Sequence, residues 1–228
     1  KIALADEKML PDVALLNTVF LNGLPAKVVA DTGMDVLTHS IEAYVSTNAN
    51  PFSSSFAMKS IKLIFENLVA HYNDRKIQGP KENVQFASCL AGIAFDNSSL
   101  GINHSIAHTV GAKFHIAHGR ANAIIMPYVI EVNTEANRKY FEISRELGLP
   151  SDTIEEGKYS LLSFVRILKE KLAVEKSLKD YGVDFEAFKR EIPSMLEDIK
   201  KDICTQYNPN KLTDEEYVRL LLKIYFGE

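Results

Sequence analysis

Hydrophobic residues recur at intervals of three and four positions along most of this chain. That spacing places them on one face of an α-helix, and only the start of the chain has strand-like character. We therefore expect an all-α fold, a helical bundle with one or two short leading strands at 2–5 and 13–16. Helices are expected at 25–47, 51–73, 81–95, 101–114, 119–132, 135–147, 153–173, 184–203 and 213–226.

A few residues refine this helical pattern. Gly33 predicts a local irregularity, Pro127 a kink and Pro193 an interruption of their helices. Thr213 and Glu216 have the spacing of a capping box, which marks a helix start. Small side chains in the third helix predict close helix contacts in the middle of the bundle: Ala87, Ala91, Gly92 and Ala94.

Composition and charge narrow the class of protein. The chain has 228 residues, of which 46% are hydrophobic and 25% charged, so it can bury a substantial core. Its net charge of -4 and the lack of a basic stripe argue against nucleic acid as a partner. Cys89 and Cys204 are too far apart in sequence for a zinc knuckle, and two cysteines cannot ligate an iron–sulfur cluster.

The sequence also predicts where the protein is located and how it relates to a longer chain. No apolar run approaches the roughly 20 residues that span a bilayer, and the first residues lack the regions of a signal peptide. We therefore expect a cytoplasmic protein with no membrane partner. The chain starts with Lys1 instead of Met, which indicates a piece cut from a longer protein.

Histidine and aspartate residues supply the candidate chemistry. Asp35 and His39 are four positions apart, so they share one face of a predicted helix and can bind one cation. Four further imidazoles fall within fifteen residues and could complete such a site: His104, His108, His115 and His118. Three histidines with one aspartate suit Fe(II) or Zn(II) better than Ca(II) or Mg(II).

Spacing alone does not say which of these imidazoles bind a metal. His104 and His108 lie on the same helix face, so both remain candidates. His115 would point away from its neighbours on an extended connection. His71, beside a polar helix end, is expected to be solvated and without a functional role.

Three segments of the chain resemble signature regions of a known family. They are 31–44 (Asp-Thr-Gly-Met-Asp-Val-Leu-Thr-His-Ser-Ile-Glu-Ala-Tyr), 101–108 (Gly-Ile-Asn-His-Ser-Ile-Ala-His) and 118–123 (His-Gly-Arg-Ala-Asn-Ala). They are similar to the iron-containing (group III) alcohol dehydrogenases, and look most like the propanol, ethanol and propanediol dehydrogenase branch. The resemblance covers the whole chain, strongly to about Asn133 and by helical character afterwards.

The resemblance implies a fold and a set of roles. The helical part, 21–228, would be the metal- and substrate-binding domain, a dehydroquinate synthase-like C-terminal domain, and 1–20 would be remnant strands of a nucleotide-binding domain. The metal, most simply Fe(II) with Zn(II) as the alternative, would be held by Asp35, His39, His104 and His118. His108 would be the catalytic proton relay, and Phe95 would line the substrate pocket.

The same resemblance implies the reaction of the full-length enzyme. That enzyme would interconvert a short-chain primary alcohol and its aldehyde by hydride transfer to or from NAD(P), and would be a homo-oligomer. The eleven glycines of this chain are never closer than eight positions, so no glycine-rich turn for a pyrophosphate exists here. We therefore expect no cofactor-binding residue in the chain and no activity from it alone.

Two functions from other classes remain as alternatives. A helical protein with a His/Asp metal site could be a metal-dependent hydrolase, or a metal-binding module without enzymatic activity. A hydrolase of that kind would ordinarily use adjacent His-Asp residues and a second metal. The chain contains no His-Asp dipeptide, which favours the dehydrogenase.

Overall fold

The computed structural model of the chain describes Lys8 and residues 11–228. Its long α-helices follow the expected ranges within a few residues, whereas η2 and α8 were not expected. The described residues contain no strand, which confirms the all-α class. The elements are η2 (Thr18–Leu21), α1 (Ala26–Val45), α2 (Pro51–Asn73), α3 (Gln78–Ser98), α4 (Ile102–Lys113), α5 (His118–Val132), η3 (Thr134–Ala136), α6 (Asn137–Glu146), α7 (Ile154–Lys171), α8 (Leu178–Tyr181), α9 (Phe185–Lys201), η4 (Ile203–Tyr207) and α10 (Asp214–Phe226).

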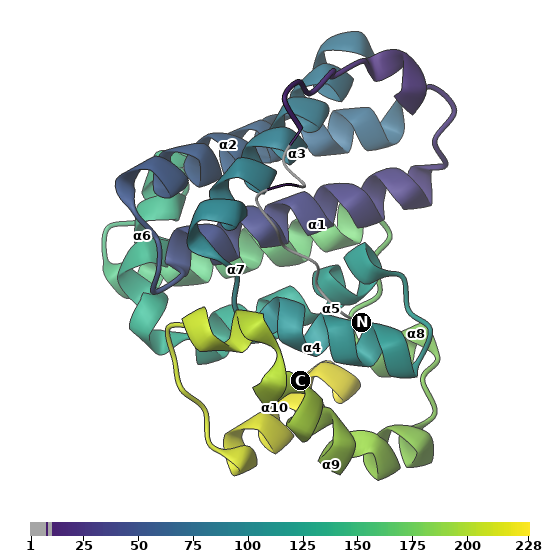
Figure 1. Cartoon of the computed structure of the whole chain (residues 1–228), viewed down its shortest axis with the longest axis vertical. Helices are drawn as coiled ribbons and strands as arrows, with labels where there is room; N and C mark the ends of the chain where they lie inside the picture. Colours follow the sequence, from purple (N-terminus) through teal and green to yellow (C-terminus); the bar gives the residue numbers. More distant parts are fainter. Residues whose placement is uncertain (1–7, 9–10) are drawn as a thin grey trace.

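α1 is the central helix of the bundle. It packs against α2, α3, α5 and α6, and α2 packs in turn along α3. Figure 1 shows α2 and α3 above α1, and α4, α9 and α10 below it. Even polar residues of α1, such as Thr38, Ser40 and Glu42, are buried as a result. Side chains on α1 therefore meet both halves of the molecule.

α4 and α5 form a second pair of packed helices. They pack against each other across the short connection 114–117, and α4 also contacts α9 and η4. α5 contacts α1, α7 and α10. The N-terminal end of α5 is thereby placed against the middle of the central helix.

Two glycines allow helices to approach closely. A Cβ atom on Gly33 would lie 2.2 Å from Leu68 Cδ1, and one on Gly119 would lie 2.2 Å from the carbonyl oxygen of Asp31. The expected irregularity at Gly33 is wrong, because α1 runs through this residue without a break. Gly33 and Gly119 instead bring α2 and α5 into contact with α1.

Two further local expectations are settled by the structure. α9 continues through Pro193, so the expected interruption is wrong. Pro193 has no backbone N–H, so the carbonyl oxygen of Lys189 loses its helical hydrogen bond. Lys189 is exposed, so water can donate to this oxygen instead. Thr213 and Glu216 form the expected capping box. α5 includes Pro127 without a break, and the expected kink there stays a prediction.

The start of the chain differs from expectation where it is described. Residues 13–16 form no strand, because no second strand among the described residues is present to pair with them. The other expected strand, 2–5, lies outside the described residues. Segment 17–22 contains η2 and is hydrogen-bonded to α3, through Gln78 to Thr18 and Lys81 to Asn22. The domain boundary at residue 20 stays a prediction.

Small side chains do bring α3 close to its neighbours. Ala87, Ala91 and Ala94 are fully or almost fully buried, whereas Gly92 faces open space. No helix in the described part of the chain is long and apolar enough to cross a membrane.

Candidate metal centre

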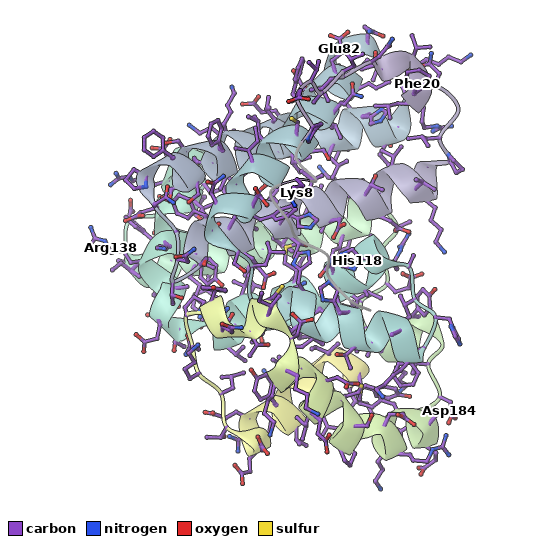
Figure 2. The ribbon with its side chains drawn as sticks, viewed as in Figure 1. Lys8, Phe20, Glu82, His118, Arg138 and Asp184 are labelled. Atoms are coloured by element: carbon purple, nitrogen blue, oxygen red, sulfur yellow. The ribbon has the colours of Figure 1, made fainter. Side chains whose placement is uncertain are left out.

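Four side chains from three helices converge beside α1. Asp35 and His39 come from α1, His104 from α4, and His118 is the first residue of α5. One potential ligand atom from each lies within 4.8 Å of the other three. Figure 2 shows the labelled His118 near the middle of the view, between the upper helices and α4. Residues 83 positions apart in sequence therefore form one polar cluster.

The donor atoms have the spacing that a small divalent cation requires. Asp35 Oδ1 lies 3.7 Å from His104 Nε2 and 3.6 Å from His118 Nε2. Atoms about 2.1 Å from a tetrahedral metal would be about 3.4 Å from each other. His104 Nε2 is buried and accepts or donates no hydrogen bond, so a polar atom at the centre of the cluster is left for a ligand. The residues present therefore fit a metal of the Fe(II) or Zn(II) type.

Glu42 fixes the ring of His104 from behind. Its Oε2 atom lies 2.5 Å from His104 Nδ1, and its Oε1 atom accepts the N–H of Asn103 at 2.8 Å. Backbone N–H groups of Asn103 and His104 donate to this carboxylate and favour its ionised form. In that form it only accepts hydrogen bonds, so it places the ring proton on Nδ1 and leaves the Nε2 lone pair free. Sequence reasoning did not find this role, although Glu42 stands three residues after His39 on the same helix.

Burial keeps the imidazoles in the form that binds metals. It lowers the pKa of His104 to about 3 and, with the neighbouring His104, that of His39 to about 4. Both rings are therefore neutral near pH 7, with a lone pair available. Burial also raises the pKa of Glu42 to about 7, although the backbone N–H groups that donate to this carboxylate act in the opposite direction.

An amide network orients the carboxylate of Asp35. Asn122 Nδ2 donates to Asp35 Oδ1 at 2.7 Å, and Asn103 Nδ2 donates to Asn122 Oδ1 at 2.8 Å. Both asparagines are buried. The chain of contacts runs from Glu42 through Asn103 and Asn122 to Asp35, so the second face of the cluster is also held by hydrogen bonds.

His108 lies beside the four-residue cluster, outside it. Its ring is stacked on that of His118, with centroids 5.2 Å apart and planes 15° apart, and its Nδ1 atom is 2.8 Å from Asp202 Oδ2. Spacing could not separate His108 from His104, whereas the geometry does. Cys204 joins His108 and Asp202 in a second group of potential donors.

Phe95 closes one side of the cluster. Its half-buried ring is stacked on His39, with centroids 4.7 Å apart. An aromatic ring at this place shields the imidazole from water. Its role in lining a substrate pocket, which the sequence resemblance implies, stays a prediction.

The two remaining histidines lie outside the cluster. His115 is exposed, on the connection between α4 and α5. His71 is 2% exposed, so the expectation of a solvated residue is wrong. It sits on the inner face of α2 close to the α2–α3 turn, and burial together with the nearby Lys81 lowers its pKa. A polar stretch such as 73–75 can follow a helix whose last turn is still buried.

Comparisons with known proteins point to one family. The family described as Fe-containing alcohol dehydrogenase, C-terminal, matches residues 29–225. An NADPH-dependent butanol dehydrogenase of Clostridium saccharobutylicum is 41% identical over the whole chain and over 58% of its own length. An aldehyde-alcohol dehydrogenase of Streptococcus pneumoniae is 37% identical over the whole chain and 27% of its own length.

Solved structures agree in fold. An iron-containing alcohol dehydrogenase of Thermococcus thioreducens superimposes with a TM-score of 0.90 at 34% identity, over 99% of this chain and 57% of that one. A 1,3-propanediol oxidoreductase gives a TM-score of 0.87 at 31% identity, over 92% of this chain and 55% of that one. The chain thus spans little more than half the length of these two structures and of the butanol dehydrogenase, and 27% of the aldehyde-alcohol dehydrogenase. It belongs to the iron-containing alcohol dehydrogenase family and matches the C-terminal part of its members.

Proposed function

We propose that this chain is the metal-binding catalytic part of an NAD(P)-dependent alcohol dehydrogenase. The observation that carries the proposal is the Asp35, His39, His104 and His118 cluster, with a buried and unpartnered His104 Nε2 among its donor atoms. The reaction would interconvert a short-chain primary alcohol and its aldehyde. Relatives named as butanol dehydrogenase and 1,3-propanediol oxidoreductase support this substrate class.

The four clustered residues would hold the metal, Fe(II) in the first place and Zn(II) as the alternative. When bound, the cation supplies a Lewis acid that polarises the oxygen of the alcohol or aldehyde. The protein's own contribution is to keep the imidazoles neutral by burial and to fix their orientation through Glu42 and Asn122. These contacts prepare the donors before a ligand arrives.

His108 and Phe95 would act on the substrate. His108 lies against His118 and can exchange a proton with the hydroxyl of the substrate. Phe95 covers His39 and would limit the entry of water to the same space. These contacts support the proposal that His108 is the catalytic residue and Phe95 a substrate-binding residue.

The nicotinamide cofactor would be bound by a part of the parent enzyme outside this chain. The 228 residues contain no glycine-rich turn, and the butanol dehydrogenase relative is named for its use of NADPH. The hydride would pass between the substrate carbon and NAD(P). We further propose that the full-length enzyme is a cytoplasmic homo-oligomer.

Metal binding is the first test. The chain purified without chelator should contain about one Fe(II) or Zn(II) per molecule by elemental analysis. Asp35→Ala and His104→Ala should each lose most of this metal. His71→Ala is the matched control, because His71 is equally buried but lies outside the cluster. Full metal content in both site variants would contradict the assignment.

Activity is the second test. The enzyme that contains this chain, supplied with NAD(P) and 1-butanol, should reduce the nicotinamide in a metal-dependent way. The chain alone should show no micromolar binding of NADH or NADPH by calorimetry. A hydrolase or a metal-binding module would retain the metal but would not reduce NAD(P), so the two assays separate these alternatives from the dehydrogenase.

A further inference from the structure

The carboxylate of Asp202 joins a distant part of the chain to His108. Asp202 lies between α9 and η4, ninety-four positions after His108, and its Oδ2 atom is 2.8 Å from His108 Nδ1. The two side chains are a quarter and about a sixth exposed. The pair is thus partly shielded from water, where a single hydrogen bond can hold a ring.

The other oxygen of Asp202 is already engaged. Oδ1 accepts the backbone N–H of Cys204 at 2.9 Å, which caps η4, and the hydroxyl of Ser105 at 3.3 Å. Ser105 stands one turn before His108 on α4, and Thr205 Oγ1 is 2.8 Å from Ser105 Oγ. The carboxylate is therefore fixed from both α4 and η4, with only Oδ2 directed at the imidazole.

These contacts decide the proton position on His108. Burial alone would raise the pKa of Asp202, but the hydrogen bonds from His108 and Cys204 lower it to about 2, so the group is an anion near pH 7. An anionic carboxylate accepts and cannot donate, so the proton of a neutral His108 ring resides on Nδ1. Nε2, on the opposite edge of the ring, carries the free lone pair.

The three-donor group of His108, Asp202 and Cys204 does not suit a cation of its own. Both oxygens of Asp202 are used in hydrogen bonds, and burial raises the pKa of the Cys204 thiol far above neutral, so no thiolate is available. A carboxylate that orients an imidazole by a hydrogen bond explains the same distances more simply.

We propose that Asp202 is a positioning residue, which holds His108 as the Nδ1–H tautomer and presents Nε2 to the reacting hydroxyl. The role of Nε2 rests on the proposed dehydrogenase function, whereas the tautomer itself does not. The arrangement follows the same logic as an aspartate that orients a catalytic histidine in a hydrolase triad. It gives the C-terminal helices, which contact α4 through α9 and η4, a direct part in the site.

Asp202→Asn is a sharp probe of this proposal. The asparagine can keep Oδ1 on the N–H of Cys204 and so preserve the cap of η4. Its NH₂ group would then face His108 Nδ1 and donate to it. The ring proton would move to Nε2, and the lone pair would be lost from the edge that faces the substrate.

The tautomer can be measured without any activity. In the Zn(II)-loaded chain with ¹⁵N-labelled histidine, NMR in the pH range where the His108 ring is neutral should show His108 protonated on Nδ1. Asp202→Asn should convert the signal to the Nε2–H form. Ser105→Ala is the control: it removes a bond to Asp202 Oδ1 without touching Oδ2, so the Nδ1–H form should remain.

Kinetic measurements then test whether the enzyme depends on this orientation of the His108 ring. In the enzyme that contains this chain, Asp202→Asn should lower kcat on the order of 10²-fold or more, with little change in KM and no loss of metal. Asp202→Ser also keeps a side chain that can cap η4, so loss of function in both variants with unchanged circular dichroism separates orientation from folding.

Each outcome decides the proposal. An Nε2–H form of His108 in the unmodified chain, or an unchanged tautomer in Asp202→Asn, would overturn it. So would full turnover by Asp202→Asn in an enzyme that oxidises alcohols. If the enzyme does not oxidise alcohols but its His108 still shows the Asp202-dependent tautomer, the proposed function is contradicted. The positioning of the ring by Asp202 is then still supported.

Discussion

Glu42 Oε2 lies 2.5 Å from His104 Nδ1, and both side chains are almost fully buried. The contact places a carboxylate of α1 directly behind an imidazole of α4. Because it engages Nδ1, the opposite nitrogen of His104 faces the Asp35, His39 and His118 side chains with its lone pair free. The orientation of a ligand ring is thus built into the packing of two helices.

Replacing Glu42 should weaken the metal site without removing a ligand. In Glu42→Gln the amide NH₂ would replace either Oε1, which accepts the N–H of Asn103, or Oε2, which faces the N–H and Nδ1 of His104, so it would meet a donor in either position. We expect Zn(II) affinity to fall about 10- to 100-fold in a chelator competition assay. Glu66→Gln, on an exposed position of α2, should leave the affinity unchanged. Equal affinities for the two variants would contradict the role of Glu42.

Two Gly→Ala substitutions should have opposite effects on stability. A Cβ on Gly119 would lie 2.2 Å from the backbone oxygen of Asp31 and 3.3 Å from Asp35 Cβ, so Gly119→Ala must push α5 away from α1. The expected loss is about 1–3 kcal/mol, with weaker metal binding because His118 moves too.

Gly92→Ala is the matched control for that substitution. No atom lies within 4 Å of a Cβ at Gly92, which is inside α3, so alanine should stabilise the chain by about 0.5–1 kcal/mol. Urea unfolding curves of both variants give the comparison. A stable Gly119→Ala variant with full metal affinity would show that α5 can shift at little cost.

His108 and His104 should differ in what their loss removes. In the enzyme that contains this chain, His104→Ala should lose both metal and turnover, because His104 supplies a donor atom of the cluster. His108→Ala should keep the metal and lower kcat, because its ring is outside the cluster and bonded to Asp202. Elemental analysis and steady-state assays check both. If His108→Ala empties the site as His104→Ala does, His108 is a ligand.

Lys169 should make stability depend on pH. Its side chain is almost fully buried and donates to the carbonyls of Ile124 and Lys176, and burial, aided by Arg166, lowers its pKa to about 7. In the unfolded chain a lysine keeps its proton up to about pH 10.4. Between about pH 7 and 10 the unfolded state therefore binds more protons, so the free energy of unfolding rises with pH.

Lys169→Met should remove this rise. Urea unfolding between about pH 6 and 10 would show a flatter profile for the variant than for the native chain. Lys171→Met, at an exposed position in the last turn of the same helix, should keep the native slope. Parallel profiles for the native chain and Lys169→Met would mean that Lys169 remains charged when buried.

Local features of the fold could be read directly from the sequence. The spacing of apolar residues predicted the long helices within a few residues, and Thr213 with Glu216 marked the start of the last one. The pairing of Asp35 with His39 was equally local, because four positions make one helical turn. Misjudged positions, such as Gly33 and Pro193, were those where a residue's usual preference is overruled by a neighbouring helix or by water.

The rest of the site depends on contacts between distant residues. Sequence spacing left His104, His108 and His118 equivalent, and only their resemblance to family motifs separated them before the structure was considered. Glu42 behind His104 and Asp202 beside His108 join positions 62 and 94 residues apart. His71 was misjudged for the same reason, since its burial is set by the helices packed around it.

Helical periodicity therefore determined the secondary structure and one edge of the candidate site, because those depend on residues within a turn of each other. The packing of α4, α5 and η4 around α1 decided which imidazoles meet Asp35 and which nitrogen of His104 and of His108 faces a carboxylate. A hydrogen bond requires atoms within about 3 Å and a defined angle, and no sequence spacing sets that distance between separate helices.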